Sequence, residues 1–214
     1  MLYLTDTILD EAESQDIISK IMASDQWIDG NSTATYTDKN IKKNLQLSGK
    51  HLPLETNSIK EKIMNNENIK GFFFPRHIHN VLFARTGTGM YYRSHTDIPV
   101  INSGRRDLSF TLFLEDKNTF SGGELILNIP PEAKSVKLGQ GQAIVYPTEY
   151  IHEVKPVTSG ERVVCVGWIE SEIPERRDRE ILSSISASLD HINDPMARLN
   201  ANNAYNILYK RFSR

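Results

Sequence analysis

The stretch Met90-Tyr91-Tyr92-Arg93-Ser94-His95-Thr96-Asp97 (residues 90–97) places a histidine and a carboxylate two positions apart at the end of a strand-like run. Side chains two residues apart on a β-strand project from the same face, so His95 and Asp97 can reach one cavity and bind one metal ion. The best candidate for a third ligand is His152, in the strand-like segment 145–154. Because an isolated histidine-x-aspartate is a weak signal, a surface pair or a pair held by hydrogen bonds is the alternative.

A set of two histidines and one carboxylate occupies one face of an octahedron and leaves three positions open. This arrangement suits non-haem Fe(II) that also holds a co-substrate and O₂, whereas zinc is more often four-coordinate with one open position. Arg162 gives an independent signal, because it lies ten residues after His152 and shares its strand parity with Val164 and Trp168. A buried arginine needs an anionic partner, which is either a ligand carboxylate or a structural partner such as Glu124.

The region from residue 78 to residue 169 consists of short apolar runs separated by glycine, proline and asparagine. This pattern predicts an all-β sandwich or barrel, and about eight antiparallel strands in two facing sheets is the count of a jelly roll. Apolar and polar residues alternate in the run 108–114, which predicts a half-buried strand there. The expected strands span residues 79–85, 90–96, 108–114, 123–127, 135–138, 142–146 and 162–169.

Helical spacing dominates the N-terminal third of the chain. It predicts a helix over residues 9–22 with Asp10 as N-cap and Glu13 as capping-box partner, and a second helix over 58–69 with Asn57 as its cap. The polar stretch between these helices is not decided by periodicity, and part of it is interpreted as a strand or an active-site loop.

Helical spacing returns after residue 171, with Pro174 in a first turn and Pro195 at the start of a last helix. The charged run 175–180 is interpreted as the solvated face of the first of these helices. The expected organisation is a single structural domain: a helical and loop region at 1–72, a β core at 73–171 and C-terminal helices at 172–214. The apolar residues of these last helices leave an oligomer open.

Composition narrows the class of protein. The 214 residues are 39% hydrophobic, enough for one domain with a full core, and 25 basic against 27 acidic residues leave a net charge of -2. Without a basic tract, nucleic acid is not expected as a partner. The sequence lacks both an apolar run of about 20 residues and a signal-peptide pattern, so we expect no membrane association and a cytoplasmic location. The single cysteine, Cys165, is predicted to be buried and inert.

The set His95-Thr96-Asp97, His152 and Arg162 resembles that of the Fe(II)- and 2-oxoglutarate-dependent oxygenases, which have a double-stranded β-helix. More closely, the chain resembles the PKHD-type hydroxylases, a bacterial branch near the prolyl 4-hydroxylases. This resemblance implies a mainly β fold with flanking helices around a cupin-like jelly-roll core, with the two histidines and the aspartate as Fe(II) ligands. The matching stretches are residues 43–47, 89–97, 105–114, 122–125, 136–138, 146–147 and 151–158.

The resemblance also implies a co-substrate site. Arg162 is expected to pair with the distal carboxylate of 2-oxoglutarate. Relatives usually carry a tyrosine nine residues before the first iron histidine that helps to hold this carboxylate, but this chain has Thr86, with a shorter hydroxyl. Tyr146 is a further candidate for this site. Tyr92 is expected near the metal and the substrate, and its alternative is an aromatic core residue.

The implied activity couples oxidative decarboxylation of 2-oxoglutarate to succinate with hydroxylation of a substrate C–H bond. It uses Fe(II) and O₂, with L-ascorbate as a candidate reductant. The substrate is left open between a prolyl residue of a peptide or protein and a small molecule. Arg105 and Arg106 could attract an acidic substrate, or they belong to an ordinary surface loop. The alternative functions are a cupin-like metal enzyme that does not use 2-oxoglutarate and a non-catalytic jelly-roll binding module.

Overall fold

The computed structural model describes residues 3–33, 40–101 and 104–213 of the chain. Within these ranges the strands are β1 (Leu4–Thr7), β2 (Ile28–Asp29), β3 (Lys42–Lys43), β4 (Leu45–Ser48), β5 (Pro75–Gly87), β6 (Tyr91–His95), β7 (Val100–Ile101), β8 (Gly104–Arg105), β9 (Leu108–Phe113), β10 (Ser121–Gly122), β11 (Leu125–Ile129), β12 (Glu132–Val136), β13 (Gln142–Pro147), β14 (His152–Val154), β15 (Val157–Ser159) and β16 (Glu161–Ser171). The helices are α1 (Glu11–Met22), α2 (Pro53–Asn65), α3 (Glu67–Phe73), α4 (Arg176–Leu189) and α5 (Pro195–Phe212), with short 3₁₀ turns η1 (Gly30–Thr33) and η2 (Gly49–His51).

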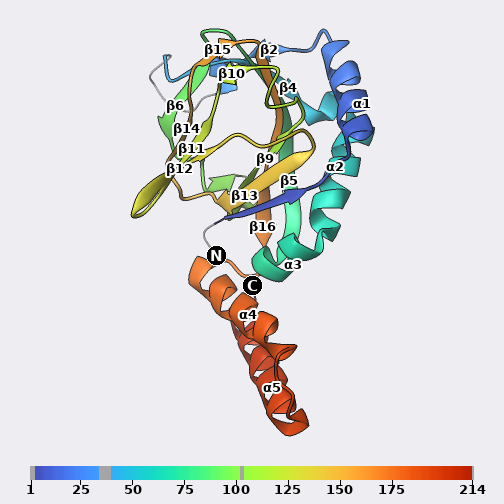
Figure 1. The fold of residues 1–214 in the computed structure, drawn as a ribbon, viewed down its shortest axis with the longest axis vertical. Helices are drawn as coiled ribbons and strands as arrows, with labels where there is room; N and C mark the ends of the chain where they lie inside the picture. Colours follow the sequence, from blue (N-terminus) through green and yellow to red (C-terminus); the bar gives the residue numbers. More distant parts are fainter. Residues whose placement is uncertain (1–2, 34–39, 102–103, 214) are drawn as a thin grey trace.

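Two facing sheets form the body of the molecule (Figure 1). The larger sheet has the strand order β1-β13-β9-β16-β5-β4-β2, and the smaller sheet has the order β12-β11-β14-β6-β3. Neighbouring strands in both sheets run antiparallel, as in the register Val164↔Ala84 between β16 and β5. The predicted mainly β jelly roll with flanking helices is therefore confirmed, and each of the seven predicted strands overlaps an observed one.

The larger sheet is covered on its outer face by α1, α2 and α3, which lie along one side of the barrel in Figure 1. Ile21 of α1 and Ile59 of α2 pack in one apolar cluster with Leu112 of β9. The inner face of β9 is also buried, because Ser109 and Thr111 line a cavity between the sheets. The expectation that this strand is half buried is therefore wrong, since helices cover the side that would otherwise face water.

The helix predictions are partly confirmed. Asp10 caps α1 and forms the predicted capping box with Glu13. The single helix predicted over residues 58–69 is wrong, because two helices occupy this region. Asn66 lies between them in an extended conformation, and its side chain accepts a hydrogen bond from the backbone N–H of Ile69. The extended residue ends α2, and its side chain caps α3.

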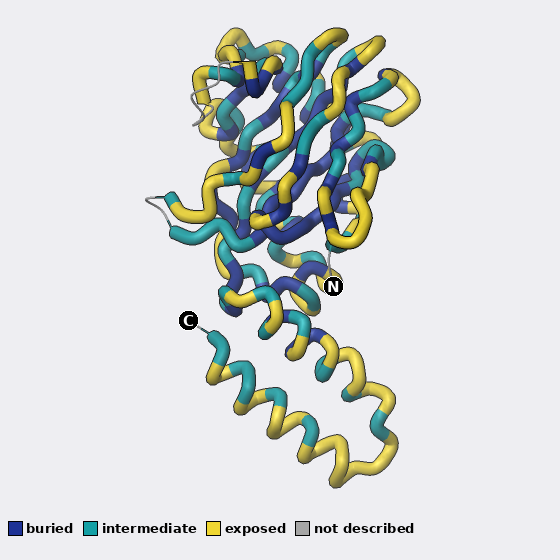
Figure 2. Tube along the Cα trace, turned by 90° about the vertical axis from the view of Figure 1, so that its left-hand side faces the viewer, coloured by how far each residue is buried: buried dark blue, intermediate teal, exposed yellow. Residues whose placement is uncertain are grey.

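A hairpin of α4 and α5 projects away from the barrel (Figures 1 and 2). It is anchored where Phe74, Ile173 and Leu182 form a small apolar cluster that also contacts α5. Arg179 is only 3% exposed, and it donates hydrogen bonds to the carbonyl oxygens of Ile173 and Pro174 at 2.7 Å. The interpretation of residues 175–180 as a solvated face is therefore wrong for Arg179, which joins the hairpin to the end of β16.

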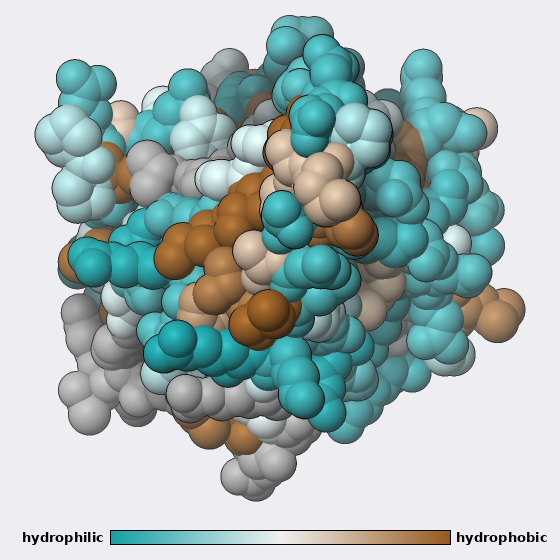
Figure 3. Space-filling model, turned by 90° about the horizontal axis from the view of Figure 1, so that it is seen from below, coloured by the Kyte–Doolittle hydropathy of each residue, from teal (hydrophilic) through white to brown (hydrophobic). Residues whose placement is uncertain are grey.

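The far part of the hairpin is open to solvent. All described residues of α5 are at least partly exposed, and Met196, Leu199 and Ile207 are more than half exposed. Seen from below, hydrophobic surface runs through the middle of this face among hydrophilic side chains (Figure 3). An oligomer through these helices stays a prediction. None of the helices in the described part of the chain is both long and apolar enough to cross a bilayer.

Candidate metal and co-substrate site

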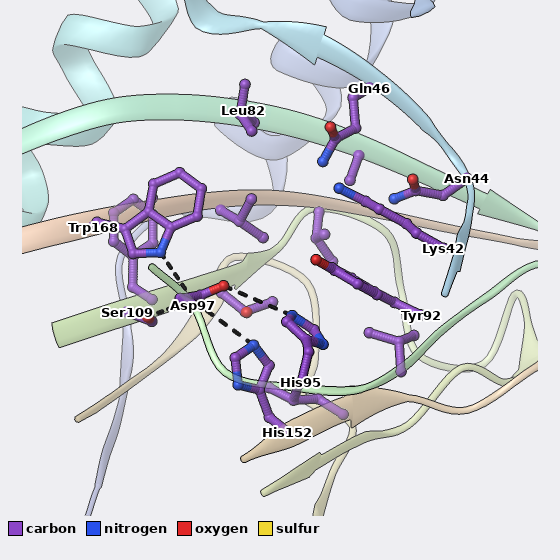
Figure 4. A pocket seen from close by; sticks show the side chains of 18 of the residues that line it. Lys42, Asn44, Gln46, Leu82, Tyr92, His95, Asp97, Ser109, His152 and Trp168 are labelled. Atoms are coloured by element: carbon purple, nitrogen blue, oxygen red, sulfur yellow. Dashed lines mark hydrogen bonds and ion pairs between the residues drawn. The ribbon is translucent and has the colours of Figure 1, made fainter. Parts of the chain in front are cut away.

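The three candidate metal ligands meet at one end of the cavity between the sheets (Figure 4). His95 is the last residue of β6, Asp97 follows in the loop, and His152 begins β14, directly opposite His95 in the register of the two strands. The expected strand over residues 145–154 is interrupted, because β13 ends at Pro147 and a turn separates it from β14. The ligand atoms of His95, Asp97 and His152 all lie within 4.8 Å of one another.

Hydrogen bonds orient both imidazole rings. Nδ1 of His95 lies 2.8 Å from the carbonyl oxygen of Arg93, and Nδ1 of His152 lies 2.9 Å from that of Tyr150. A carbonyl oxygen can only accept, so each Nδ1 donates and each Nε2 carries the free lone pair. These Nε2 atoms lie 3.7 and 3.8 Å from the carboxylate oxygens of Asp97. Burial, together with the neighbouring His152, lowers the pKa of His95 to about 4, which keeps its ring neutral.

The carboxylate of Asp97 is held by two further donors. Its Oδ2 accepts hydrogen bonds from Oγ of Ser109 at 2.8 Å and from Nε1 of Trp168 at 2.9 Å. Burial favours the neutral form of Asp97, but the nearby His152, these two donors and His95 outweigh it and hold its pKa below the usual range. The alternative of a simple surface pair is excluded by burial, while the histidine lone pairs and a fixed carboxylate oxygen are the donors that a metal ion requires.

Tyr92 faces the same cavity although it lies three residues before His95. The register between β6 and β14 shifts between His95↔His152 and Tyr92↔Val154. Such a bulge turns a side chain to the other face of a strand. The Tyr92 ring consequently stacks on His95, with ring centroids 3.6 Å apart. Tyr92 thus lines the cavity beside a candidate metal ligand, and its role at the metal and the substrate stays a prediction.

The predicted co-substrate residues lie deeper in the cavity. Arg162 is 3% exposed, and Thr86 stands directly opposite it in the register of β16 and β5. Tyr146 lines the same cavity, and the guanidinium carbon of Arg162 lies 5.2 Å from the centre of the Phe113 ring. In the described part of the chain Arg162 forms no ion pair with Glu124 or another carboxylate, and its Nε has no hydrogen-bond partner. Burial lowers its pKa to about 10.

Arg105 and Arg106 have different surroundings, and each fits one of the two roles considered for the pair: an ordinary structural role or a place at the substrate site. Arg105 is structural, since it donates to Asp107 at 3.3 Å and to the carbonyl oxygen of Ser171 at 2.9 Å. Arg106 lines the cavity, and its guanidinium carbon lies 4.0 Å from the centre of the Trp168 ring. One of the two arginines therefore belongs to the site.

Three more cavity residues are absent from the predicted site: Lys42, Asn44 and Gln46. They belong to the stretch that periodicity leaves undecided, of which residues 34–39 lie outside the described residues. Lys42 is 7% exposed, and its Nζ lies 4.7 Å from the centre of the Tyr92 ring. The alternation of polar residues at 42, 44 and 46 is the signal that could have identified them.

The cavity has a volume of about 320 Å³, within the usual range for small-molecule sites. Two imidazole nitrogens and one carboxylate oxygen converge at one end, and a buried arginine lies in the same cavity. This donor set fits Fe(II), because it fills one side of the ion and leaves positions for other ligands. The cavity can therefore hold a metal ion and a small dicarboxylate together.

Comparison with known proteins defines the class. The model of the 2OG-Fe(II) oxygenase superfamily matches residues 63–170, which contain the three candidate ligands and Arg162. Two solved structures have the same fold. A prolyl-4-hydroxylase of Pseudomonas putida has a TM-score of 0.57 at 18% identity, over 79% of this chain and 92% of its own. The viral collagen prolyl hydroxylase of Paramecium Bursaria Chlorella virus-1, in its 2OG complex, has a TM-score of 0.60 at 20% identity, over 80% and 97%.

A PKHD-type hydroxylase of Prochlorococcus marinus (strain MIT 9313) is 42% identical over 187 residues, which cover 86% of this chain and 85% of the relative. The chain belongs to the PKHD-type hydroxylase family. It is an Fe(II)- and 2-oxoglutarate-dependent hydroxylase that couples decarboxylation of 2-oxoglutarate to succinate with hydroxylation of a C–H bond, using O₂. This membership favours hydroxylation over the cupin-like enzyme without 2-oxoglutarate and over the non-catalytic module.

Proposed function

We propose that His95, Asp97 and His152 bind the iron of this hydroxylase, and that Arg162 binds the distal carboxylate of 2-oxoglutarate. The observation that carries this proposal is the pairing of two features in one cavity: converging imidazole and carboxylate donors, and a buried guanidinium without an ion-pair partner among the described residues. Bound Fe(II) supplies the oxidative chemistry. The protein contributes the placement of both reactants and the exclusion of water.

Each residue of the site then has a definite task. Ser109 and Trp168 hold the Asp97 carboxylate in one orientation, so that the metal is bound without reorganisation of its ligand. Thr86 and Tyr146 border Arg162 and complete the pocket for the distal end of 2-oxoglutarate. Tyr92, stacked on His95, shields one side of the metal site and contacts the substrate.

The substrate proposed for this site is a prolyl residue of a peptide or protein. The two solved structures compared above are prolyl hydroxylases, and one of them is a collagen prolyl hydroxylase. The exposed rim of the cavity supports a substrate that enters from solvent, since Ile98 beside the metal site is 38% exposed. A prolyl ring is compact enough to enter the cavity while the rest of a peptide lies outside.

The ligand assignment is tested with His152→Ala and with His51→Ala as a matched control, because His51 is an exposed histidine outside the cavity. We expect His152→Ala to lose Co(II) binding, followed by the visible absorption of the metal, and succinate formation. His51→Ala should retain both. Metal binding by His152→Ala equal to that of the unaltered protein would remove His152 from the ligand set.

The substrate assignment is tested by mass spectrometry. Proline-containing peptides and cell-extract proteins are incubated with the enzyme, Fe(II), 2-oxoglutarate and ascorbate. The expected product gains one oxygen, and fragmentation locates it on proline. An oxygen located on another residue type, or on a small molecule of the extract only, contradicts the prolyl assignment while it leaves the hydroxylase activity in place.

A further inference from the structure

One wall of the cavity is built from hydrogen-bond donors. Lys42, Asn44 and Gln46 occupy alternate positions along β3 and β4, and their side chains point toward the space above Tyr92 (Figure 4). All three are buried, with exposed fractions of 7%, 8% and 4%. Buried polar groups of this kind are costly without a partner. We call these three residues the donor wall.

The oxygens of the two amides in the donor wall lie against other groups of the protein. Oε1 of Gln46 accepts a hydrogen bond of 2.5 Å from Oγ1 of Thr33. Oδ1 of Asn44 lies against Gly30, only 1.8 Å from where a Cβ at that position would stand. The NH₂ groups of both amides therefore face the cavity, beside the ammonium group of Lys42 (Figure 4). A ligand at this wall must offer acceptors, because amide NH₂ and ammonium groups only donate.

A second cation, Arg106, borders the same cavity beside Trp168. Its Nε is buried and has no hydrogen-bond partner within the described ranges. The charge of Asp97 acts on both Arg106 and Lys42, so both cations lie near the metal site. Among the described residues no carboxylate forms an ion pair with Lys42 or Arg106.

The charges of the loaded site leave these two cations unbalanced. The two charges of Fe(II) and the charge of Arg162 offset those of Asp97 and of the two carboxylates of 2-oxoglutarate. Among the described residues that line the cavity, Lys42 and Arg106 then remain as two positive charges, of which Lys42 is buried and Arg106 is partly buried. Charges in such surroundings need a counter-charge or the desolvation cost is not recovered.

We infer that the donor wall and Arg106 form a carboxylate-binding subsite, so that the substrate hydroxylated here carries an acidic group close to the reacting carbon. The inference rests on the proposed function, since it names the substrate class for that same site. The carboxylate has two possible sources: an acidic side chain next to proline in a peptide, or the free α-carboxylate of a small acid. Lys42 is a positioning and specificity residue in either case.

The test measures binding by isothermal titration to the enzyme loaded with Fe(II) and 2-oxoglutarate under nitrogen. The first pair of probes is N-acetyl-L-proline and its amide. The second pair is a capped peptide with glutamate after proline and the same peptide with glutamine. The variants are Lys42→Met, which keeps the length but removes the charge, Lys42→Arg, and the control Lys43→Met, because Lys43 is exposed on the same strand.

We expect the unaltered enzyme to prefer the acidic member of at least one pair by about tenfold or more, the effect of one charge-assisted hydrogen bond. Lys42→Met should abolish this preference, while Lys42→Arg and Lys43→Met should keep it. The pair that shows the preference identifies the source of the carboxylate. Equal affinities within both pairs, or no binding of either acid, overturn the inference, as does a preference that Lys42→Met leaves unchanged.

Two further outcomes separate this inference from the proposed function. If Lys42→Met instead raises the KM for 2-oxoglutarate, Lys42 serves the co-substrate and the substrate subsite is refuted. If the acids bind through Lys42 but no prolyl residue gains oxygen, the subsite stands and the prolyl assignment fails. If acidic and neutral prolyl peptides are hydroxylated equally, the prolyl assignment stands and the subsite fails.

Discussion

Replacing Arg162 by methionine should make the protein more stable and yet strongly weaken its binding of the co-substrate. Arg162 is buried and forms no ion pair with a described residue. Burial lowers its pKa from 12.5 to about 10, which corresponds to a penalty of roughly 3 kcal/mol on the charged form. The penalty is fully present at neutral pH, because the charge is lost only when the pH rises through about 10.

Methionine fills a similar length without a charge, so the free energy of unfolding without ligand should rise by about 1 to 3 kcal/mol. When 2-oxoglutarate is present, the unaltered protein should be the more stable of the two. Removing one partner of a buried charge pair costs about 2 to 5 kcal/mol of binding free energy, a loss of affinity of about 30-fold or more. At a ligand concentration of about 100 times the dissociation constant, the unaltered protein gains about 2.7 kcal/mol, whereas the variant should gain less than about 1 kcal/mol.

The assay is urea unfolding with Fe(II) under nitrogen, with and without 2-oxoglutarate. Arg85→Met is the matched control, because Arg85 is half-buried on β5 and already paired with Glu161 at 3.0 Å. We expect the control to lose about 1 kcal/mol at most and to keep its full response to 2-oxoglutarate. An Arg162→Met variant that 2-oxoglutarate stabilises as strongly as the unaltered protein would refute the reasoning.

Three other predictions concern the rest of the site. Trp168→Phe removes the N–H that is donated to the aspartate ligand and should weaken Fe(II) binding by about 10- to 100-fold; unchanged affinity in equilibrium dialysis would show that this hydrogen bond does not tune the metal site. Because burial lowers the pKa of Lys42 to about 8, affinity for an acidic probe should fall as the pH rises from 7 to 9, while Lys42→Arg should not show this fall; parallel titration curves for the two proteins would assign the effect to another group. Gly30→Ala would place a Cβ 1.8 Å from the Asn44 side-chain oxygen and should lower the free energy of unfolding by about 1 to 3 kcal/mol; an unchanged midpoint in urea would mean that the amide moves at little cost.

Much of the fold and part of the site could be predicted because they depend on how side chains alternate between the two faces of a single strand. The parity of Arg162 with Val164 and Trp168 predicts that it faces inward, and the structure places all three around the cavity. The two-residue spacing of His95 and Asp97 predicts a shared cavity in the same way, although Asp97 lies just beyond the end of β6. In both cases local geometry is sufficient.

Other features depend on residues far along the chain, where period alone carries no information. Lys42 takes its place from pairing with Tyr92 of β6, and Gln46 from pairing with Ala84 of β5. Arg179 is buried because the carbonyl groups at the end of β16 need a donor, a requirement that the charged run around it does not reveal. Tyr92 reaches the site through a bulge, which a strict alternation would exclude.

The strand β16 sets the distance between two residues that line the catalytic cavity. It carries Arg162 near one end and Trp168, the partner of the Asp97 carboxylate, six positions later on the same face. At about 3.3 Å per residue, one continuous strand separates their backbones by roughly 20 Å. Because both side chains depend on the alternation along β16, insertion of one residue between them would turn Arg162 or Trp168 out of the cavity. The residue count along β16 therefore fixes how far the buried guanidinium of Arg162 lies from the group that holds the Asp97 carboxylate.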